Sequence, residues 1–174
     1  AGEASRAARL VASVAPLSGI EPGTVMPIVL GPRSSRSVAR PLQSLDVRAR
    51  FDLNVRISNV GGNLQMVQMP IKVDNTPLRI VGRVGDSLYR SARAAGVSAG
   101  VAQSFIRAIS SKVDFDRDLA SDARFDMIVE HQRAETGESK TGKLMYIGIH
   151  RGNRAIRMIP WTIGGRTDWY DAAG

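Results

Sequence analysis

The chain has 174 residues, 43% of them hydrophobic and 23% charged, which suits one domain or two small ones with a packed core. It contains no cysteine, which excludes disulfides, thiolate zinc sites and cysteine nucleophiles. The formal net charge is +8, and twenty of the 24 basic residues are Arg, spread along the chain. Such a surface suits an anionic polymer of the cell envelope, or is simply a soluble basic surface. Only 5% of residues are aromatic, so we expect no nucleic acid as a partner.

The amino-terminal residues are predicted to form a helix. Glu3, Arg6 and Arg9 alternate with apolar residues at helical spacing. This segment lacks the basic start, apolar block and cleavage site of a signal peptide, and no run in the chain approaches the roughly 18 apolar residues of a membrane span. Because helix-like sequence begins at once without a Met, we expect a fragment or a processed product with no membrane span.

Strand patterns follow. Period-two alternation over Asp46–Ser58 predicts one long strand with a single buried face. Asn59–Asn63 predicts a turn, and Leu64–Met69 the returning arm of a hairpin. Leu78–Val84 predicts a further strand that ends at Gly85.

The period then changes to that of helices. Asp86 is positioned to cap a helix over Ser87–Ala95, and Ser98 or Gly100 opens a second helix that reaches about Lys112. The two helices form a helical hairpin. Three more strands follow, over Arg124–Gln132, Lys143–His150 and Ala155–Trp161. The pattern predicts an α+β fold of mostly antiparallel strands with a short helical hairpin and two small subdomains.

A weak internal repeat suggests how the chain is divided. Helix, turn and strand succeed one another in residues 1–30 and again in residues 99–129. We expect three segments: a partial helix–strand repeat over residues 1–45, a β-hairpin segment over 46–84, and the helical hairpin with antiparallel strands over 85–174.

Tests for chemistry find no catalytic centre. The only histidines, His131 and His150, lack the His-x-x-x-Asp, His-x-His or His-Glu-x-x-His spacing of zinc ligands. Ser87 resembles a nucleophile only superficially and is better used to start a helix. The alternating aspartates of Asp114–Asp118 lack the Gly and Glu of a calcium loop, so we expect helix-end and turn caps over Asp114–Asp122. We therefore expect no catalytic residue, no metal ligand and no cofactor in this chain.

One cluster near the carboxyl end is a candidate contact site. Gly164-Gly165 precedes a group of residues suited to contact sugar rings or another domain, and Trp161 stands just before it. The alternative is a terminal strand that closes the core with Trp161. The candidate residues are Trp161, Arg166, Trp169 and Tyr170.

Several motifs resemble one family. Gly85–Ala92 reads GDSLYRSA, and Val113–Leu119 reads VDFDRDL. Both resemble the region preceding the catalytic domain in bacterial LytM-type (lysostaphin-like) zinc metallopeptidases, whose members carry a G-x-S-L-Y-x-x-A-x-x-x-G helix and an I-D-F-x-R-D-L turn. The similarity continues through Arg124–Glu130, Gly142–Tyr146 and Thr167–Gly174, and upstream through Arg40–Leu42 and Asp46–Leu53.

The resemblance implies a non-catalytic part of a larger enzyme. The zinc ligands of the family belong to a peptidase domain that would begin after Gly174, so none is carried over and zinc is expected only in that domain of the parent. Residues 1–45 would be LysM-like. The implied function is a regulatory or positioning module of a murein endopeptidase in the periplasm or cell envelope. The implied partners are peptidoglycan or the parent's own peptidase domain. A glycan-binding module without a regulatory role is the alternative, and nucleic-acid binding rests on charge alone.

Overall fold

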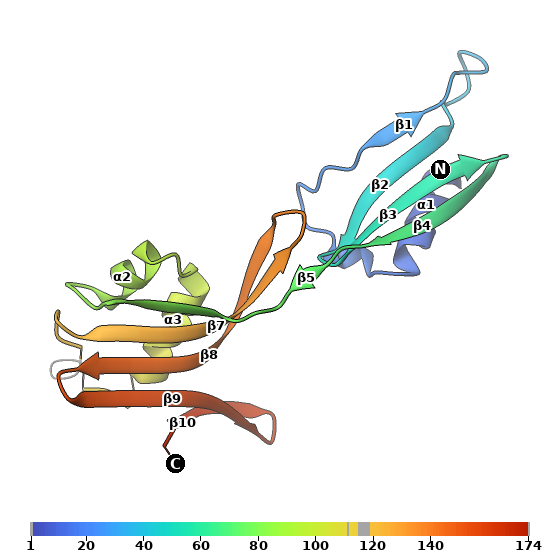
Figure 1. The fold of residues 1–174 in the computed structure, drawn as a ribbon. Helices are drawn as coiled ribbons and strands as arrows, with labels where there is room; N and C mark the ends of the chain where they lie inside the picture. The colour runs from blue at the N-terminus through green and yellow to red at the C-terminus, as the bar shows by residue number, and fades with distance from the viewer. Residues whose placement is uncertain (1, 111, 115–118, 174) are drawn as a thin grey trace. The chain divides into compact units, whose positions relative to one another are not determined.

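The computed structural model describes residues 2–110, 112–114 and 119–173 (Figure 1). The chain forms two compact units. The first runs to Val73 and includes Ala134–Gly137, and the second contains Asp74–Arg133 and the chain from Glu138 onward. None of the described helices has the length and apolar character that crossing a membrane requires. The predicted α+β fold of mostly antiparallel strands in two subdomains is confirmed.

The first unit is a four-stranded antiparallel sheet with a helix on one face. Ala7 and Val11, one helical turn apart, are buried in a core shared with Ile57. The carboxylate of Glu3 accepts the backbone N–H of Leu42 at 3.0 Å, which ties the helix to the sheet. The elements are α1 (Gly2–Ala12), η1 (Leu17–Gly19), β1 (Ile28–Leu30), β2 (Leu42–Arg50), β3 (Leu53–Val60) and β4 (Asn63–Pro70), with strand order β1-β2-β3-β4.

The single strand predicted over Asp46–Ser58 is wrong, because the chain turns in its middle. β2 ends at Arg50 and β3 begins at Leu53. Opposite residues pair as Val47 does with Val55, so the residue numbers of most paired residues differ by an even number. The odd-numbered residues therefore stay on one face through the turn, and the alternation alone does not distinguish one long strand from this hairpin.

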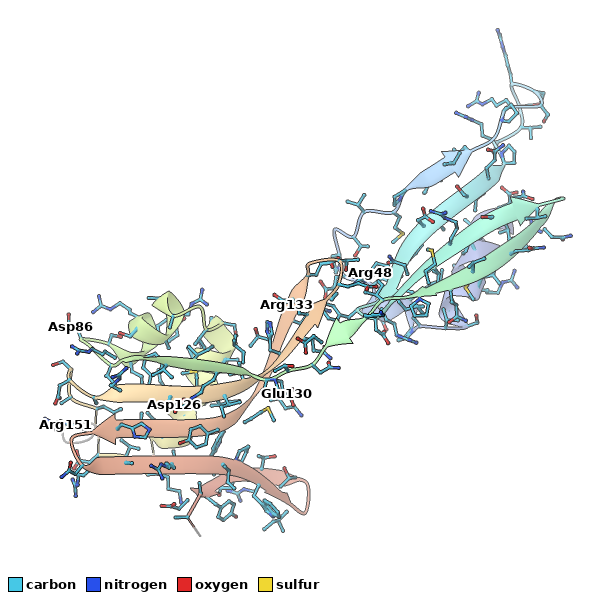
Figure 2. All side chains as sticks on the ribbon, viewed as in Figure 1. Arg48, Asp86, Asp126, Glu130, Arg133 and Arg151 are labelled. Carbon is cyan, nitrogen blue, oxygen red and sulfur yellow. The ribbon has the colours of Figure 1, made fainter. Side chains whose placement is uncertain are left out.

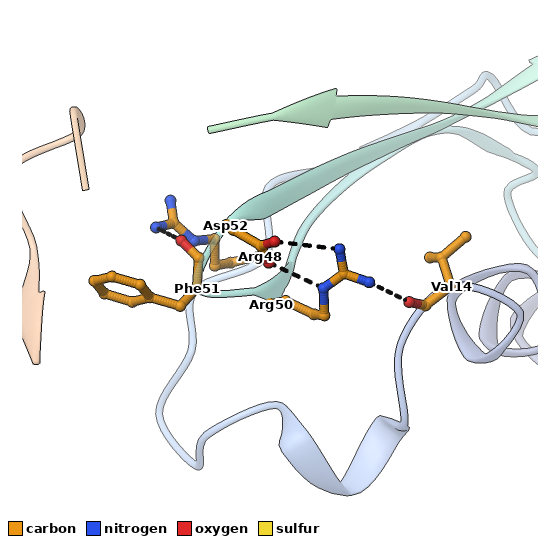
Figure 3. A network of polar contacts seen from close by, with 5 residues as sticks. All are labelled: Val14, Arg48, Arg50, Phe51 and Asp52. Carbon is orange, nitrogen blue, oxygen red and sulfur yellow. Dashed lines mark hydrogen bonds and ion pairs between the residues drawn. The ribbon is translucent and has the colours of Figure 1, made fainter. Parts of the chain in front are cut away.

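Two arginines hold this turn (Figure 3). Arg48 donates to the carbonyl of Phe51 at 2.6 Å, and Arg50 donates to Asp52 and to the carbonyl of Val14, both at 2.9 Å. The hydrogen bond from Arg50 also lowers the pKa of Asp52. Neither central residue has positive φ, so the turn forms without glycine. The next hairpin turns at Gly61-Gly62, with φ of 58° and 85°, as the sequence predicted.

The second unit is a larger antiparallel sheet with two helices on one face (Figure 1). Its strand order is β10-β9-β8-β7-β5, and β6 also pairs with β7. The elements are β5 (Val73–Asp74), β6 (Leu78–Arg83), α2 (Leu88–Ala94), α3 (Ala99–Ile109), β7 (Arg124–Ala134), β8 (Ser139–Arg151), β9 (Arg154–Ile163) and β10 (Arg166–Asp171).

The helices and the sheet share one apolar core. Phe105 of α3 and Phe125 of β7 are fully buried, with ring centroids 6.2 Å apart and planes inclined by 58°. A Cβ on Gly82 of β6 would lie 2.4 Å from Cζ of Phe125, so only a glycine fits against that ring. This contact fixes the register of β6 against β7.

The predicted helical hairpin is present, with one correction to its start. Ser87, not Asp86, is the N-cap of α2, and its hydroxyl accepts the backbone N–H of Arg90. Asp86 lies one residue too early for its carboxylate to take that position. Of the two predicted starts of the second helix, Ser98 and Gly100, Ser98 is the N-cap of α3, and its hydroxyl accepts the N–H of Val101.

Candidate binding face

The sheet of the second unit has one face covered by helices and one face open. Phe125, Met127 and Val129 of β7 are buried beneath the helices, so the residues between them point the other way. Cross-strand pairing carries this alternation to the neighbouring strands. We call the uncovered side the open face. Its residues include Arg79, Val81, Arg124, Asp126, Ile128, Tyr146, Gly148, His150, Arg157, Ile159, Trp161 and Tyr170.

The hairpin of β9 and β10 places three of the four candidate residues together. Trp161 is 60% exposed and Tyr170 is 47% exposed. Trp161 pairs with Asp168, and Tyr170 lies two residues further along β10, so the two rings are diagonal neighbours on one face. Arg166 lies two residues before Asp168 on β10, so it points to the same face. These three residues form the aromatic end of the open face.

Trp169 is separated from the other candidates. It pairs with Pro160 on the opposite side of the hairpin and packs, partly buried, against the core of the second unit. The alternative was a terminal strand that closes the core with Trp161. The terminal strand β10 does contact the core, through Trp169, whereas Trp161 is exposed. Adjacent strand residues point to opposite faces, which is why Trp169 and Tyr170 do not act together.

An ion pair that the sequence did not reveal lies at the centre of the open face (Figure 2 labels Asp126). Arg79 donates through Nε to Oδ1 of Asp126 at 2.9 Å and through a terminal nitrogen to Oδ2 at 2.5 Å. The Asp126 side chain is 7% exposed, while that of Arg79 is 67% exposed. The hydrogen bond that Arg79 donates to Asp126, together with the negative charge of that carboxylate, raises the pKa of Arg79. In the sequence, this ion pair could have been predicted from one feature, the single acidic residue Asp126 within the apolar residues of β7.

Arginine outnumbers carboxylate in the middle of the open face. Arg79 and Arg124 lie on neighbouring strands, and Arg157 lies directly across from Gly148. Asp126 is the buried carboxylate among them, and it is already paired. Guanidinium groups beside exposed aromatic rings suit a ligand with both apolar rings and negative charge.

The two histidines do not form a metal site. His131 pairs with Thr141 and His150 pairs with Arg124, several rows apart on β7 and β8. The described residues contain no group of three or more His, Asp or Glu side chains that could hold a metal, so they do not fit a zinc site. Both ring nitrogens of His131 are buried without a hydrogen-bond partner among the described residues, beside a hollow of about 380 Å³ that Asn75 and Gln132 also line.

Part of the acidic stretch lies outside the described residues. Residues 115–118 are among these, so the structure does not test the predicted turn caps or the motif over Val113–Leu119. Downstream, Arg151 donates to Asp122 at 3.1 Å at one end of the sheet (Figure 2).

The first unit contains an apolar pocket of about 430 Å³. It lies between α1 and the first two strands, where alanines leave space beside Ile28, Leu42 and Leu45. Its two charged lining residues are engaged by the backbone: Glu3 accepts from Leu42, and Arg40 donates to the carbonyl of Gly31. The pocket has almost no polar group available to bind a ligand, so we place the candidate site on the open face.

Comparison with known proteins gives structural neighbours only. A scan of family models and a search of curated proteins each found no match. A zinc-containing peptidase from Vibrio cholerae superposes with a TM-score of 0.55 at 19% identity, over 89% of this chain and 45% of that protein. Helicobacter pylori Csd3 superposes with TM-scores of 0.53 and 0.51 in two crystal forms, at 14% and 15% identity, over 88% of this chain and 40% of Csd3. The chain thus spans less than half the length of these neighbours and shares the fold of that part.

Proposed function

We propose that this chain is a non-catalytic regulatory or positioning module of a peptidoglycan-cleaving zinc endopeptidase in the periplasm. The observation that carries the proposal is the fold match, in which 89% of the chain corresponds to less than half of a zinc-containing peptidase. The motifs of α2 and β7 support the same enzyme class through sequence. In this proposal zinc belongs to the peptidase domain of the parent.

The open face is the surface through which the module would act. Trp161 and Tyr170 offer exposed ring faces to a sugar or a peptide, and the arginines offer positive charge to carboxylates. Peptidoglycan carries sugar rings and carboxylates together. We therefore propose peptidoglycan as the partner, with the peptidase domain of the parent as the other candidate.

The absence of catalysis is tested with the purified chain. We would incubate it with isolated sacculi and with soluble muropeptides, with and without added zinc, and analyse the products by chromatography. The proposal predicts no zinc-dependent release of fragments. Zinc-dependent cleavage by the 174-residue chain would overturn it.

A glycan-binding module without a role in the peptidase is the second candidate. The observation that favours it is the exposure of Trp161 and Tyr170 on one face. A module that positions an endopeptidase on the wall through this face is expected to recognise the peptide part of the wall, which is what the enzyme cleaves. It should be retained by intact sacculi and released when the stem peptides are stripped from the glycan. Equal retention by stripped glycan strands would favour the second candidate.

A further inference from the structure

β4 is an open edge of the sheet in the first unit (Figure 1). It pairs with β3 along all eight of its residues, and no described residue forms a backbone hydrogen bond on its other side. Edge strands are commonly protected by charge, a bulge or short length. β4 carries no charged residue and its pairing has no bulge, whereas the opposite edge strand β1 has three residues and an irregular register. β4 is therefore the edge of this sheet that is best suited to accept another strand.

The outward-pointing backbone groups of β4 follow from the turn that precedes it. Gly61-Gly62 is a two-residue turn, so the residues on either side of it form a hydrogen-bonded pair, and such pairs alternate along the hairpin. The N–H and C=O groups of Leu64, Met66 and Gln68 therefore point away from β3. These groups can form the ladder of an added strand.

A groove of about 320 Å³ lies between α1 and the start of β4. Its two arginines are exposed, and neither forms an ion pair with a described residue. The one carboxylate of α1, Glu3, accepts from Leu42 and lines the apolar pocket instead of this groove. The groove thus places positive charge beside the open edge. Its lining residues are Arg6, Arg9, Leu10, Asn63 and Leu64.

A strand added to β4 would present its side chains alternately to two different surfaces. On the α1 side they would meet Arg6 and Arg9, whose guanidinium groups suit carboxylates. On the other side they would meet Val67, which is 58% exposed, and Met69. These two residues lie there because they alternate with Met66, which packs against the core. The matching strand has carboxylates on one side and apolar side chains on the other.

A second copy of this chain matches the edge less well. Its β4 has no carboxylate to meet the arginines. Pairing of two β4 strands about a two-fold axis perpendicular to the sheet would also place both copies of α1 on one side, where Arg6 and Arg9 of both copies would repel one another. Charge complementarity therefore favours an acidic partner.

We propose that the open edge of β4, together with the groove beside α1, binds an extended segment of a partner protein in which acidic residues alternate with apolar ones. The segment would add a strand to the sheet through the backbone of Leu64, Met66 and Gln68 and would place its carboxylates beside Arg6 and Arg9. The site lies in the first unit and requires neither the open face nor the proposed function.

The test is an NMR titration of the whole chain with capped peptides of eight residues, the length of β4. The first peptide alternates valine with glutamate. The second has glutamine in place of glutamate, and the third is the first with an N-methyl group on every backbone amide, which blocks strand pairing.

Two variants are each compared with a matched control. Gln68→Pro removes an outward N–H without removing a hydrogen bond to β3, and Gln68→Ala loses the same side chain but keeps the N–H. Arg6→Gln/Arg9→Gln removes the charge of the groove. Arg33→Gln/Arg36→Gln removes the same charge from exposed residues of the first unit outside the groove.

We expect the glutamate peptide to shift the amides of Leu64, Met66 and Gln68 most and to slow their exchange with solvent, because these amides gain a partner. The glutamine peptide should bind roughly fivefold more weakly at low salt, the effect of two exposed ion pairs, and Arg6→Gln/Arg9→Gln should weaken binding of the glutamate peptide equally. Gln68→Pro should weaken binding about tenfold, the effect of one lost backbone hydrogen bond. Both control variants should bind as the unmodified chain does.

Each part of the proposal has its own contrary result. Equal affinity for the glutamate and glutamine peptides would overturn the acidic segment. Equal affinity for the N-methylated peptide would overturn strand addition, and this comparison uses the unmodified chain, so it does not depend on the folding of Gln68→Pro. Slow exchange of the three amides in a peptide-free chain that sediments as a dimer would assign the edge to a second copy and overturn the proposal.

Discussion

Gly82→Ala is the substitution whose cost follows most directly from the geometry of the covered face of the second unit's sheet, where Gly82 pairs with Phe125. The added Cβ would lie 2.4 Å from Cζ of Phe125, a ring that is fully buried and held by Phe105. Overpacking of this kind costs about 1–3 kcal/mol, and replacing glycine by alanine recovers about 0.4–1 kcal/mol from the unfolded chain. We expect a net loss of about 1–2 kcal/mol, which lowers the Tm of a unit of this size by roughly 5–15 °C.

The assay is urea unfolding followed by circular dichroism, with Gly100→Ala as the matched control. Gly100 lies in α3, and a Cβ added there would have nothing within 4 Å, so the same chemical change should stabilise the protein by about 0.5–1 kcal/mol. Phe125→Leu should relieve part of the loss in the double variant. If Gly82→Ala is neutral or stabilising, the register of β6 against β7 is wrong, and with it the residues assigned to the open face.

Four further substitutions test burial, packing and charge. Phe105→Ala should destabilise the protein by about 3–5 kcal/mol in the same unfolding assay. Trp161→Ala should change stability by less than about 0.5 kcal/mol, whereas Trp169→Ala should cost about 1–3 kcal/mol, and equal losses would contradict their placement on opposite faces. The hydrogen bond from Arg56 holds the pKa of Asp46 below its ordinary 3.8, so the stability it adds is present above that pH and lost as the pH falls through the lower folded value. An NMR titration of the Asp46 carboxyl should show this lowered midpoint, and Arg56→Gln should return it to the ordinary range.

The sequence predicted elements well where a turn residue or a change of period marked the boundary. Gly61-Gly62 marked one hairpin, and Ser98 marked the start of α3. It failed between Arg50 and Leu53, because that turn is held by arginine side chains, one of which donates to the carbonyl of Val14, 36 residues earlier in the chain. Contacts of that kind have no local signature in the sequence.

The site was predicted in part for a similar reason. The candidate cluster named the right hairpin, but only pairing in the sheet shows that Trp169 faces the core while Trp161 and Tyr170 face outward. The ion pair of Arg79 with Asp126 was missed, since its two residues are 47 positions apart and meet only through the pairing of β6 with β7. The division into segments 1–45, 46–84 and 85–174 stays a prediction.

Retention on isolated sacculi tests the central claim most directly. The unmodified chain, the Trp161→Ala/Tyr170→Ala double variant and the Val67→Ala control would be sedimented with sacculi at ~0.15 M salt, where long-range attraction by the basic surface is screened. We expect the unmodified chain and Val67→Ala to sediment with the wall and the double variant to stay in solution. An unmodified chain that stays in solution, or a double variant that sediments as well as the control, would contradict the proposed wall-binding role.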